Sequence, residues 1–125
     1  VSRTMVEYGR GGLRYLDGDM AGARTSLDTI RSLPPQGLEP PGIAILRSLS
    51  GTLADWQVAL AYGQAADAAR LLEPELVAGN VTLDTLSGAG RAIRNLGEGQ
   101  ALRQVVDRAC AGGAQVACDF SRNTF

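Results

Sequence analysis

Apolar residues recur at intervals of three and four along most of this chain, the spacing that places them on one face of an α-helix. In the first segment they stand at Met5, Tyr8, Leu13 and Leu16, ahead of a turn at residues 17–19. In the run after this turn they stand at Ala23, Leu27 and Ile30. That run ends at Leu33-Pro34-Pro35, because proline cannot continue a helix and disfavours the helical conformation of its predecessor. The two runs predict one helical hairpin.

A second hairpin is expected after a loop over residues 34–42. This segment holds four prolines and two glycines, which is typical of a stiff irregular connection. One helix is predicted from about residue 43 to residue 62, with its apolar stripe at Leu46, Leu49, Leu53, Trp56 and Leu60. After a break at Gly63-Gln64, a second helix runs toward Val77, and Pro74 is expected to kink it or end it early. Gly79-Asn80 closes the pair.

A third hairpin begins at Thr82, whose hydroxyl can accept a hydrogen bond from the first turn of a helix. Its first helix is expected to bury Leu83, Leu86, Gly90, Ile93 and Leu96. A break at Gly97-Glu98-Gly99 follows, and the last full helix carries Leu102, Val105, Val106 and Ala109. No segment alternates like a strand over a useful length. The pattern therefore predicts an all-α fold of three stacked antiparallel helical hairpins plus a short C-terminal helix.

The predicted hairpins are spaced like a repeat. The turn glycines Gly63 and Gly97 are 34 residues apart, and Gly18 and Gly63 are 45 apart, which is 34 plus an insertion of 11 at the proline-rich loop. Five positions after the turn glycines stand Ala23, Ala68 and Leu102, and nine positions after them stand Leu27, Leu72 and Val106. Stacked hairpins need such a register, because the second helix must offer a small or apolar residue where the first one crosses it.

Residues 18–35, GDMAGARTSLDTIRSLPP, resemble the second half of a tetratricopeptide repeat, from the Gly-Asp turn to the terminal proline. The first halves of two units fit if the turn is one residue shorter than usual, through Tyr8, Gly12, Tyr15 and through Leu53, Trp56, Leu60. The third unit fits the ordinary length through Leu86, Ala89, Gly90 and Ile93. The resemblance implies one domain, part of a larger protein, with repeats over residues 3–35, 43–79 and 80–113 and a helix over 114–125. A generic helical bundle is the alternative.

Residues 109–118, ACAGGAQVAC, resemble the junction between cysteine-rich Sel1-like repeats. There an Ala-Cys ends one helix, a glycine turn follows, and a cysteine eight positions on opens the next helix. The resemblance implies a disulfide between Cys110 and Cys118 that fastens residues 114–125, although Phe120 stands one position earlier than the apolar residue of that family. The alternative is two reduced cysteines that serve as small buried apolar groups.

Little in the chain points to catalysis, a metal or a cofactor. It has no histidine, which excludes Ser-His-Asp and Cys-His nucleophiles as well as histidine-based metal sites. Asp17 and Asp19 flank a turn glycine but lack the further ligands of a calcium loop, so turn formation and capping are expected. Gly9, Gly11, Gly12, Gly88 and Gly90 lie in helical stripes, and we interpret them as sites of close helix packing. We predict no catalytic residue, no metal and no cofactor.

Charge and hydropathy narrow the choice of partners. The net charge is −1 and all twelve cations are arginine, so no electrostatic argument favours nucleic acid. Apolar runs such as residues 43–46 are far shorter than the ~20 residues that cross a bilayer. The partner expected is therefore a protein or a peptide.

The tetratricopeptide resemblance implies that the first helices of successive hairpins line a binding groove. Mapped onto the third unit, that groove receives Arg91, Arg94 and Asn95, whose guanidinium groups share a helix face and suit a carboxylate or a phosphorylated segment. Gln57 of the second unit and Tyr8 or Tyr15 of the first are candidates to extend the same surface. The alternative is that the arginines belong to an ordinary solvated face.

Three functions agree with these features. The first is a scaffold that binds a protein or peptide in the groove, within a bacterial envelope or secreted protein. The second is a structural module whose apolar ends stack on flanking repeats or form a homodimer, and the third is a helical accessory domain of a multidomain enzyme or receptor. A disulfide would imply a periplasmic or extracellular location, whereas reduced cysteines would fit the cytoplasm.

Overall fold

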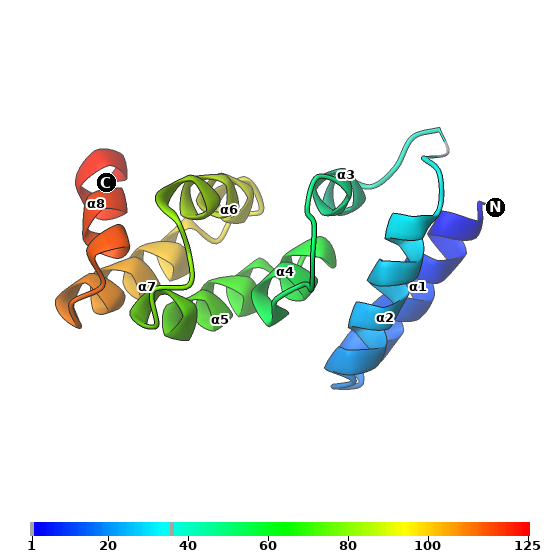
Figure 1. The fold of residues 1–125 in the computed structure, drawn as a ribbon, viewed down its shortest axis with the longest axis horizontal. Coiled ribbons are helices and arrows are strands. Elements are labelled where there is room, and N and C mark those ends of the chain that lie inside the picture. Colours follow the sequence, from blue (N-terminus) through cyan, green and yellow to red (C-terminus); the bar gives the residue numbers. More distant parts are fainter. Residues whose placement is uncertain (1, 36) are drawn as a thin grey trace. The chain divides into compact units, whose positions relative to one another are not determined.

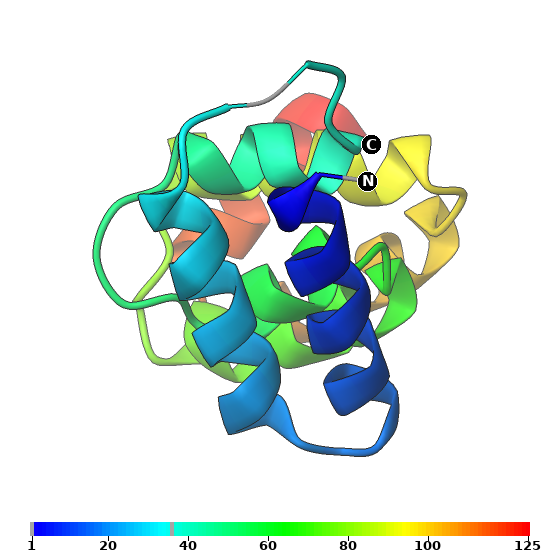
Figure 2. The same cartoon turned by 90° about the vertical axis from the view of Figure 1, so that its right-hand side faces the viewer.

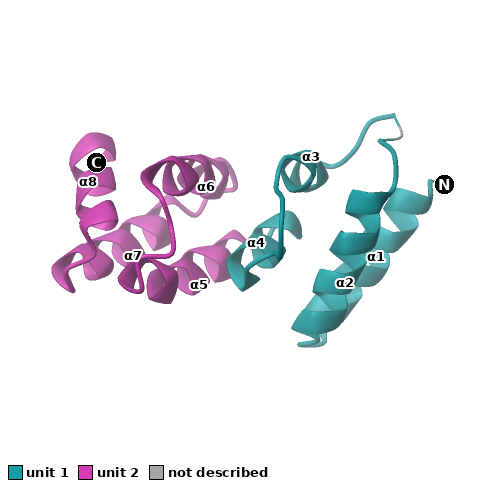
Figure 3. Cartoon of the chain, in the orientation of Figure 1, with its two compact units in different colours: residues 1–63 teal, residues 64–125 magenta. Residues whose placement is uncertain are grey.

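The computed structural model describes residues 2–35 and 37–125, and in those ranges the regular structure is entirely α-helical (Figure 1). The all-α class predicted from the sequence is confirmed. The chain forms two compact units, over residues 1–63 and 64–125 (Figure 3), and each is described by itself. The stacking of three equivalent hairpins stays a prediction.

The first unit contains helices α1 to α4. They span α1 (Arg3–Leu16), α2 (Met20–Ser32), α3 (Pro41–Arg47) and α4 (Asp55–Ala61). Helices α1 and α2 lie side by side as an antiparallel hairpin in both views (Figures 1 and 2). The core of this unit contains apolar side chains from α2, α3 and α4. No more than 1% of each is exposed in Leu27, Ile30, Ile43, Leu46 and Val58.

The helix predicted over residues 43–62 is wrong in one respect, because it is divided. Helix α3 ends at Arg47 and α4 begins at Asp55, with an irregular connection between them. The apolar stripe survives this division, since Leu46 and Leu53 are only 1% and 2% exposed. The periodicity predicted which residues are buried, but it did not predict the backbone conformation. Carbonyl groups of the connection accept hydrogen bonds from arginine side chains of α2 and not from a continuous helix.

The loop predicted over residues 34–42 also ends earlier than expected. Pro41 and Gly42 belong to α3, because proline is well tolerated in the first turn, where its missing N–H has no partner to lose. Gly42 lies so close to the carbonyl of Ala61 that a Cβ there would collide with it. Residue 36 lies outside the described part of the chain.

The second unit contains α5 (Ala65–Val77), α6 (Leu83–Asn95), α7 (Gly99–Ala111) and α8 (Gln115–Thr124). The turn between α6 and α7 shows how these helices are joined. Gly97 has φ 85°, a conformation that glycine adopts without steric cost. Its N–H donates to the carbonyl oxygen of Arg94 at 2.9 Å, and the N–H of Glu98 donates to the carbonyl oxygen of Ile93 at 3.1 Å. These bonds satisfy two carbonyl groups that the end of α6 leaves without a helical partner.

Two local predictions for this unit have different outcomes. Thr82 is the N-cap of α6, with its hydroxyl accepting from the N–H of Thr85 at 3.1 Å, as predicted. Pro74 does not end α5 early, because the helix continues to Val77. Leu72 and Leu76 lie buried on either side of the proline, so their packing holds the helix despite the missing N–H.

The repeat register from the turn glycines predicted core positions correctly. All six residues of that register are 0% exposed, namely Ala23, Leu27, Ala68, Leu72, Leu102 and Val106. The ends of the predicted stripes were wrong. Leu83 and Leu96 of α6 are 38% and 51% exposed. In α1 the error is larger and involves a whole face, which is described below.

Helix α1 turns a different face inward from the one its apolar residues predict. Thr4 and Gly11 are buried, and Tyr8 and Tyr15 pack against the core of the first unit. Gly11 is the reason, because its missing Cβ leaves room for the Tyr62 hydroxyl and for the Ser26 side chain. The close-packed glycine is therefore Gly11, one position before the Gly12 of the predicted register.

Candidate functional site

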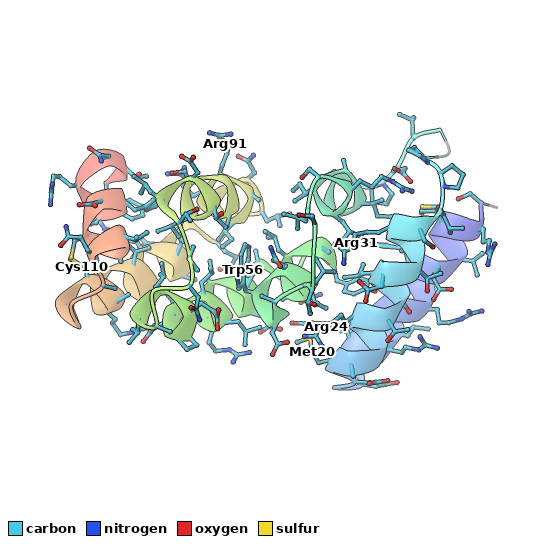
Figure 4. All side chains as sticks on the ribbon, in the orientation of Figure 1. Met20, Arg24, Arg31, Trp56, Arg91 and Cys110 are labelled. Carbon is cyan, nitrogen blue, oxygen red and sulfur yellow. A yellow bond between two sulfur atoms is a disulfide. The ribbon has the colours of Figure 1, made fainter. Side chains whose placement is uncertain are left out.

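The exposed side of α6 carries Arg91, Arg94 and Asn95, three of the six residues predicted to bind a partner. Leu86 and Ile93 on the opposite side are 0% exposed, and they anchor the helix in the second unit. Arg91 projects outward from α6, away from α7 (Figure 4). The helix therefore presents a fixed polar face to the solvent.

Helix α8 packs beside this face through Phe120. The ring lies so close to Gly90 of α6 that a Cβ there would come within 2.9 Å of its Cζ atom. The guanidinium carbon of Arg94 lies 6.0 Å from the centre of the same ring, within the range of a cation–π interaction. Arg94 is thus held against an aromatic side chain while its N–H groups stay exposed.

Arg91 and Arg94 differ from the other arginines of the second unit in their charge environment. The others each lie within 4.0 Å of a carboxylate, in the pairs Arg70–Asp67, Arg103–Asp107, Arg108–Glu73 and Arg122–Asp119. No carboxylate of the described residues lies within that distance of Arg91 or Arg94. The two cations chosen from the sequence are therefore the two that the unit leaves without an acidic partner.

The remaining predicted residues lie in the first unit, and their side chains already make intramolecular contacts. The Gln57 side chain accepts from the backbone N–H of Ala54 at 2.8 Å and so caps α4. The Tyr8 hydroxyl donates to the carbonyl of Ala61 at 2.6 Å, and its ring stacks on Tyr62 with the ring centres 5.2 Å apart. The ring centre of Tyr15 lies 5.9 Å from that of Tyr62.

This tyrosine cluster is partly removed from water. Burial raises the pKa of Tyr8 above its usual value. Burial raises the pKa of Tyr62 further, and the nearby Tyr8 and Glu7 add to the effect. Because the Tyr62 hydroxyl donates to the carbonyl of Ala23 at 3.1 Å, both neutral hydroxyl groups serve as donors that hold the first unit together.

The six predicted residues do not form one site that the structure describes. Arg91, Arg94 and Asn95 share α6, whereas Gln57, Tyr8 and Tyr15 belong to the first unit, where they cap or pack. A groove that runs through all of them stays a prediction. The outer face of α6, which we define as Arg91, Arg94 and Asn95, is the part of it that remains a candidate.

The two cysteines lie at the junction of α7 and α8. Cys110 and Cys118 are at disulfide distance, with their Cα atoms 4.7 Å apart. The turn between them is closed by Gly113, whose N–H donates to the carbonyl of Cys110 at 2.9 Å. The link fixes α8 next to α7, and with it the Phe120 ring on which Arg94 lies.

Sequence reasoning missed two sets of contacts. In the sequence Phe120 stands out only as an apolar residue out of register, whereas in the structure it is 1% exposed and supports Arg94. The other set comprises Arg24 and Arg31, which extend from α2 toward the connection between α3 and α4 (Figure 4). They donate to backbone carbonyls there. Their seven-residue spacing places them on one helix face, but nothing in the sequence identifies a carbonyl as the acceptor.

Comparisons with known proteins add no family to this description. We found no matching family model, no similar curated protein and no similar solved structure. Within residues 2–35 and 37–125, no cluster of three or more His, Cys, Asp or Glu side chains could hold a metal ion. No helix in the described ranges combines the length and the apolar character needed to cross a membrane. The outer face of α6 therefore remains the candidate site.

Proposed function

We propose that this chain is a protein-binding module that holds an acidic or phosphorylated peptide segment of its partner on the outer face of α6. The observation that carries the proposal is the absence of a carboxylate beside Arg91 and Arg94, when every other arginine of the second unit has one. Two cations left unpaired on one helix face favour an external anion as their partner.

The chemistry of the guanidinium group supports a carboxylate or phosphate ligand. Arginine offers planar N–H donors that match the two oxygens of a carboxylate or phosphate group. Arg91 and Arg94 are three residues apart, so they are neighbours on the helix surface and can bind the same segment. The Phe120 ring restricts Arg94, which lowers the conformational entropy lost when a ligand binds.

The proposal is tested by measuring binding of a labelled peptide rich in Asp and Glu, by fluorescence anisotropy at two salt concentrations. A peptide with Asn and Gln at the same positions is the control ligand. The test variant is Arg91→Gln/Arg94→Gln, and the matched control is Arg103→Gln/Arg122→Gln, which removes the same charge from arginines that have acidic partners.

We expect the wild type and the control variant to bind the acidic peptide, and the Arg91→Gln/Arg94→Gln variant to lose at least roughly tenfold in affinity. Equal losses in both variants would show that only net charge matters. Binding of neither peptide at millimolar concentration would also reject the proposal. Far-UV circular dichroism of all three proteins controls for loss of helix.

The same proposal includes a compartment. A cysteine pair at disulfide distance favours an oxidising environment, since disulfides persist in the periplasm and outside the cell. We therefore propose a periplasmic or extracellular bacterial protein. Intact mass of protein isolated without reductant tests this, because a disulfide lowers the mass by two hydrogens. Fully reduced cysteines in the native protein would support the cytoplasmic alternative.

A further inference from the structure

Helix α1 exposes most of its large apolar side chains. Met5 and Val6 are 42% and 49% exposed, and Leu13 and Leu16 are 67% and 71% exposed. Gly9 has no heavy atom near the position of a Cβ. Met5, Gly9, Leu13 and Leu16 are separated by four, four and three residues, so they form one continuous stripe along the helix. We call these four residues with Val6 the α1 stripe.

The α1 stripe differs from the solvent face of an ordinary amphipathic helix. The inward face of α1 carries Thr4, Tyr8, Gly11 and Tyr15. At 100° per residue, the α1 stripe occupies the next third of the helix surface, and the charged residues are confined to the remaining sector. A helix with one covered side places polar residues over the rest of its surface. The α1 stripe therefore favours a second apolar contact, on a side of α1 that the first unit does not cover.

The charges beside the α1 stripe indicate what makes that contact. Arg3 stands at the start of the helix and Asp17 caps its end, and within residues 2–35 and 37–125 neither side chain makes an ion pair or a hydrogen bond. Arg10 in the middle is already paired with Glu7 at 3.2 Å. Arg14, the other charged residue of this sector, donates to the hydroxyl of Ser26 on α2 at 2.9 Å. The charges left without a partner are therefore a positive one at the start of the helix and a negative one at its end.

This order of charges is complementary to itself when reversed. If a second α1 lies antiparallel on the first, Arg3 of each helix meets Asp17 of the other. A parallel arrangement would instead place both Arg3 side chains at one end and both Asp17 side chains at the other, so no Arg3–Asp17 pair could form. The neutralised Arg10–Glu7 pair lies near the middle in either copy, so it adds no net repulsion there.

We propose that a second copy of this chain covers the α1 stripe, with the two α1 helices antiparallel about a twofold axis near Gly9. In this arrangement Met5 of one copy lies opposite Leu13 of the other, and each contact occurs twice, as in any isologous dimer. Gly9 lies at the axis, where the lack of a side chain lets the two backbones approach. The surface is distinct from the outer face of α6.

The dimer is tested first by sedimentation equilibrium over a range of protein concentrations. The wild type is expected to approach twice its chain mass of 13.1 kDa. The variant Leu13→Glu should raise the dissociation constant at least roughly tenfold. The matched control is Val77→Glu, since Val77 is 60% exposed on α5 and outside the α1 stripe. A wild type that stays monomeric at millimolar concentration would overturn the proposal, and so would equal effects of the two variants.

Charge reversal tests the antiparallel order. Arg3→Asp alone and Asp17→Arg alone each place like charges together and should weaken the homodimer. The double variant should restore it, and an equimolar mixture of the two single variants should form a heterodimer, because both end pairs are then complementary. An acidic residue at the start of a helix and a basic residue at its end are both favourable to the helix dipole. Unfolding of α1 would therefore not explain a loss of dimerisation in either single variant. Failure of both the double variant and the mixture to restore dimerisation would reject the antiparallel pairing.

Discussion

The two units use the same residue type, arginine, for different purposes. In the first unit Arg31 donates to the carbonyls of Leu49 and Gly51 at 3.2 and 2.8 Å, and Arg24 donates to that of Leu53 at 3.0 Å. In the second unit the helices are joined by tight glycine turns that satisfy their own carbonyls. Arginine becomes structural where a connection leaves carbonyl groups without partners.

Arg47 gives the strongest instance of this difference. Its guanidinium makes two bonds to the Glu39 carboxylate, at 2.8 and 2.7 Å, and also donates to the carbonyls of Ile30 and Leu33. The bonds to Arg47 lower the pKa of Glu39. The end of α2 is thereby tied to the proline-rich loop, whereas in the second unit Arg91 and Arg94 remain available for a ligand.

The largest effect is expected from Phe120→Ala in the second unit. Phe120 is 1% exposed, and its removal leaves a cavity against Gly90 and Leu102 that should cost about 3–5 kcal/mol. Denaturant unfolding followed by circular dichroism measures this cost. The matched control is Phe125→Ala, because Phe125 is 40% exposed and its removal should cost much less. Equal costs of the two variants would contradict the burial of Phe120 in the core of the second unit.

Removal of the disulfide should have the next largest effect. Cys110→Ser/Cys118→Ser opens a loop of eight residues, which by loop entropy should cost about 2–3 kcal/mol. Fraying of α8 should remove the support of Arg94 by Phe120. Denaturant unfolding of the double variant, compared with wild type under reducing and oxidising conditions, measures this cost. A variant as stable as the oxidised wild type would show that the link contributes nothing.

Replacement of arginine tests the comparison between the units directly. Arg31→Met should cost about 2 kcal/mol, because it leaves two backbone carbonyls without their charged donor. Arg91→Met, the matched change in the second unit, removes no internal bond and should stay within about 0.5 kcal/mol of wild type. Thermal and denaturant unfolding measure both. Equal costs would contradict the division into structural and available arginines.

Two glycines of α1 should respond in opposite directions to alanine. At Gly11 the added Cβ meets the Tyr62 hydroxyl and the Ser26 side chain, which should cost about 1–3 kcal/mol. At Gly9 no atom lies within 4 Å, so the higher helix propensity of alanine should stabilise the monomer by up to about 1 kcal/mol. Unfolding at dilute concentration keeps dimer formation out of the measurement. Equal shifts would contradict the inward face of α1.

The smallest effect at neutral pH, and a clear one in alkali, is expected from the tyrosine cluster. Unfolded tyrosine ionises near pH 10, whereas burial raises the pKa of Tyr8 and Tyr62 in the folded unit. The stability they contribute is therefore present below about pH 10 and is lost as the pH rises through their folded pKa values. The chain has no lysine, so no lysine titration overlaps with that of the tyrosines in this pH range.

Denaturant unfolding between pH 8 and pH 12 measures this dependence, with tyrosinate absorbance recorded in parallel. Tyr62→Phe should flatten the alkaline decline, because it removes the group with the most strongly raised pKa. A decline of the same steepness in Tyr62→Phe would show that other groups cause it.

Much of the fold could be predicted because helices leave a local signature. The turn glycines, the Thr82 cap and the 34-residue register are readable from neighbouring residues, and the register correctly placed buried residues such as Ala68 and Val106. The division of residues 43–62 could not be read in the same way. The stripe from Leu46 to Leu60 is the same whether the backbone between them is helical or is held by arginine side chains.

The candidate site was predictable only in part for the same reason. Arg91 and Arg94 are exposed on the helix where the pattern placed them, yet their lack of acidic partners depends on where each carboxylate of the unit lies. Tyr8 and Gln57 were equally plausible from the sequence, but the backbone carbonyl and N–H groups that they bind are brought to them by the fold. The spacing of residues shows which side chains share a helix face, but it does not show which groups of other segments lie against that face.

Local chemistry alone specified most helices of this protein, most of its turns and most core positions of its second unit, because these depend on residues a few positions apart. Tertiary packing decided which side of α1 faces inward, since a single missing Cβ at Gly11 outweighed the exposed apolar residues of the α1 stripe. It also decided which arginines hold the first unit together and which are left without an acidic partner. Those outcomes depend on contacts between segments far apart in the chain, where each group takes whichever partner the packed helices bring within reach.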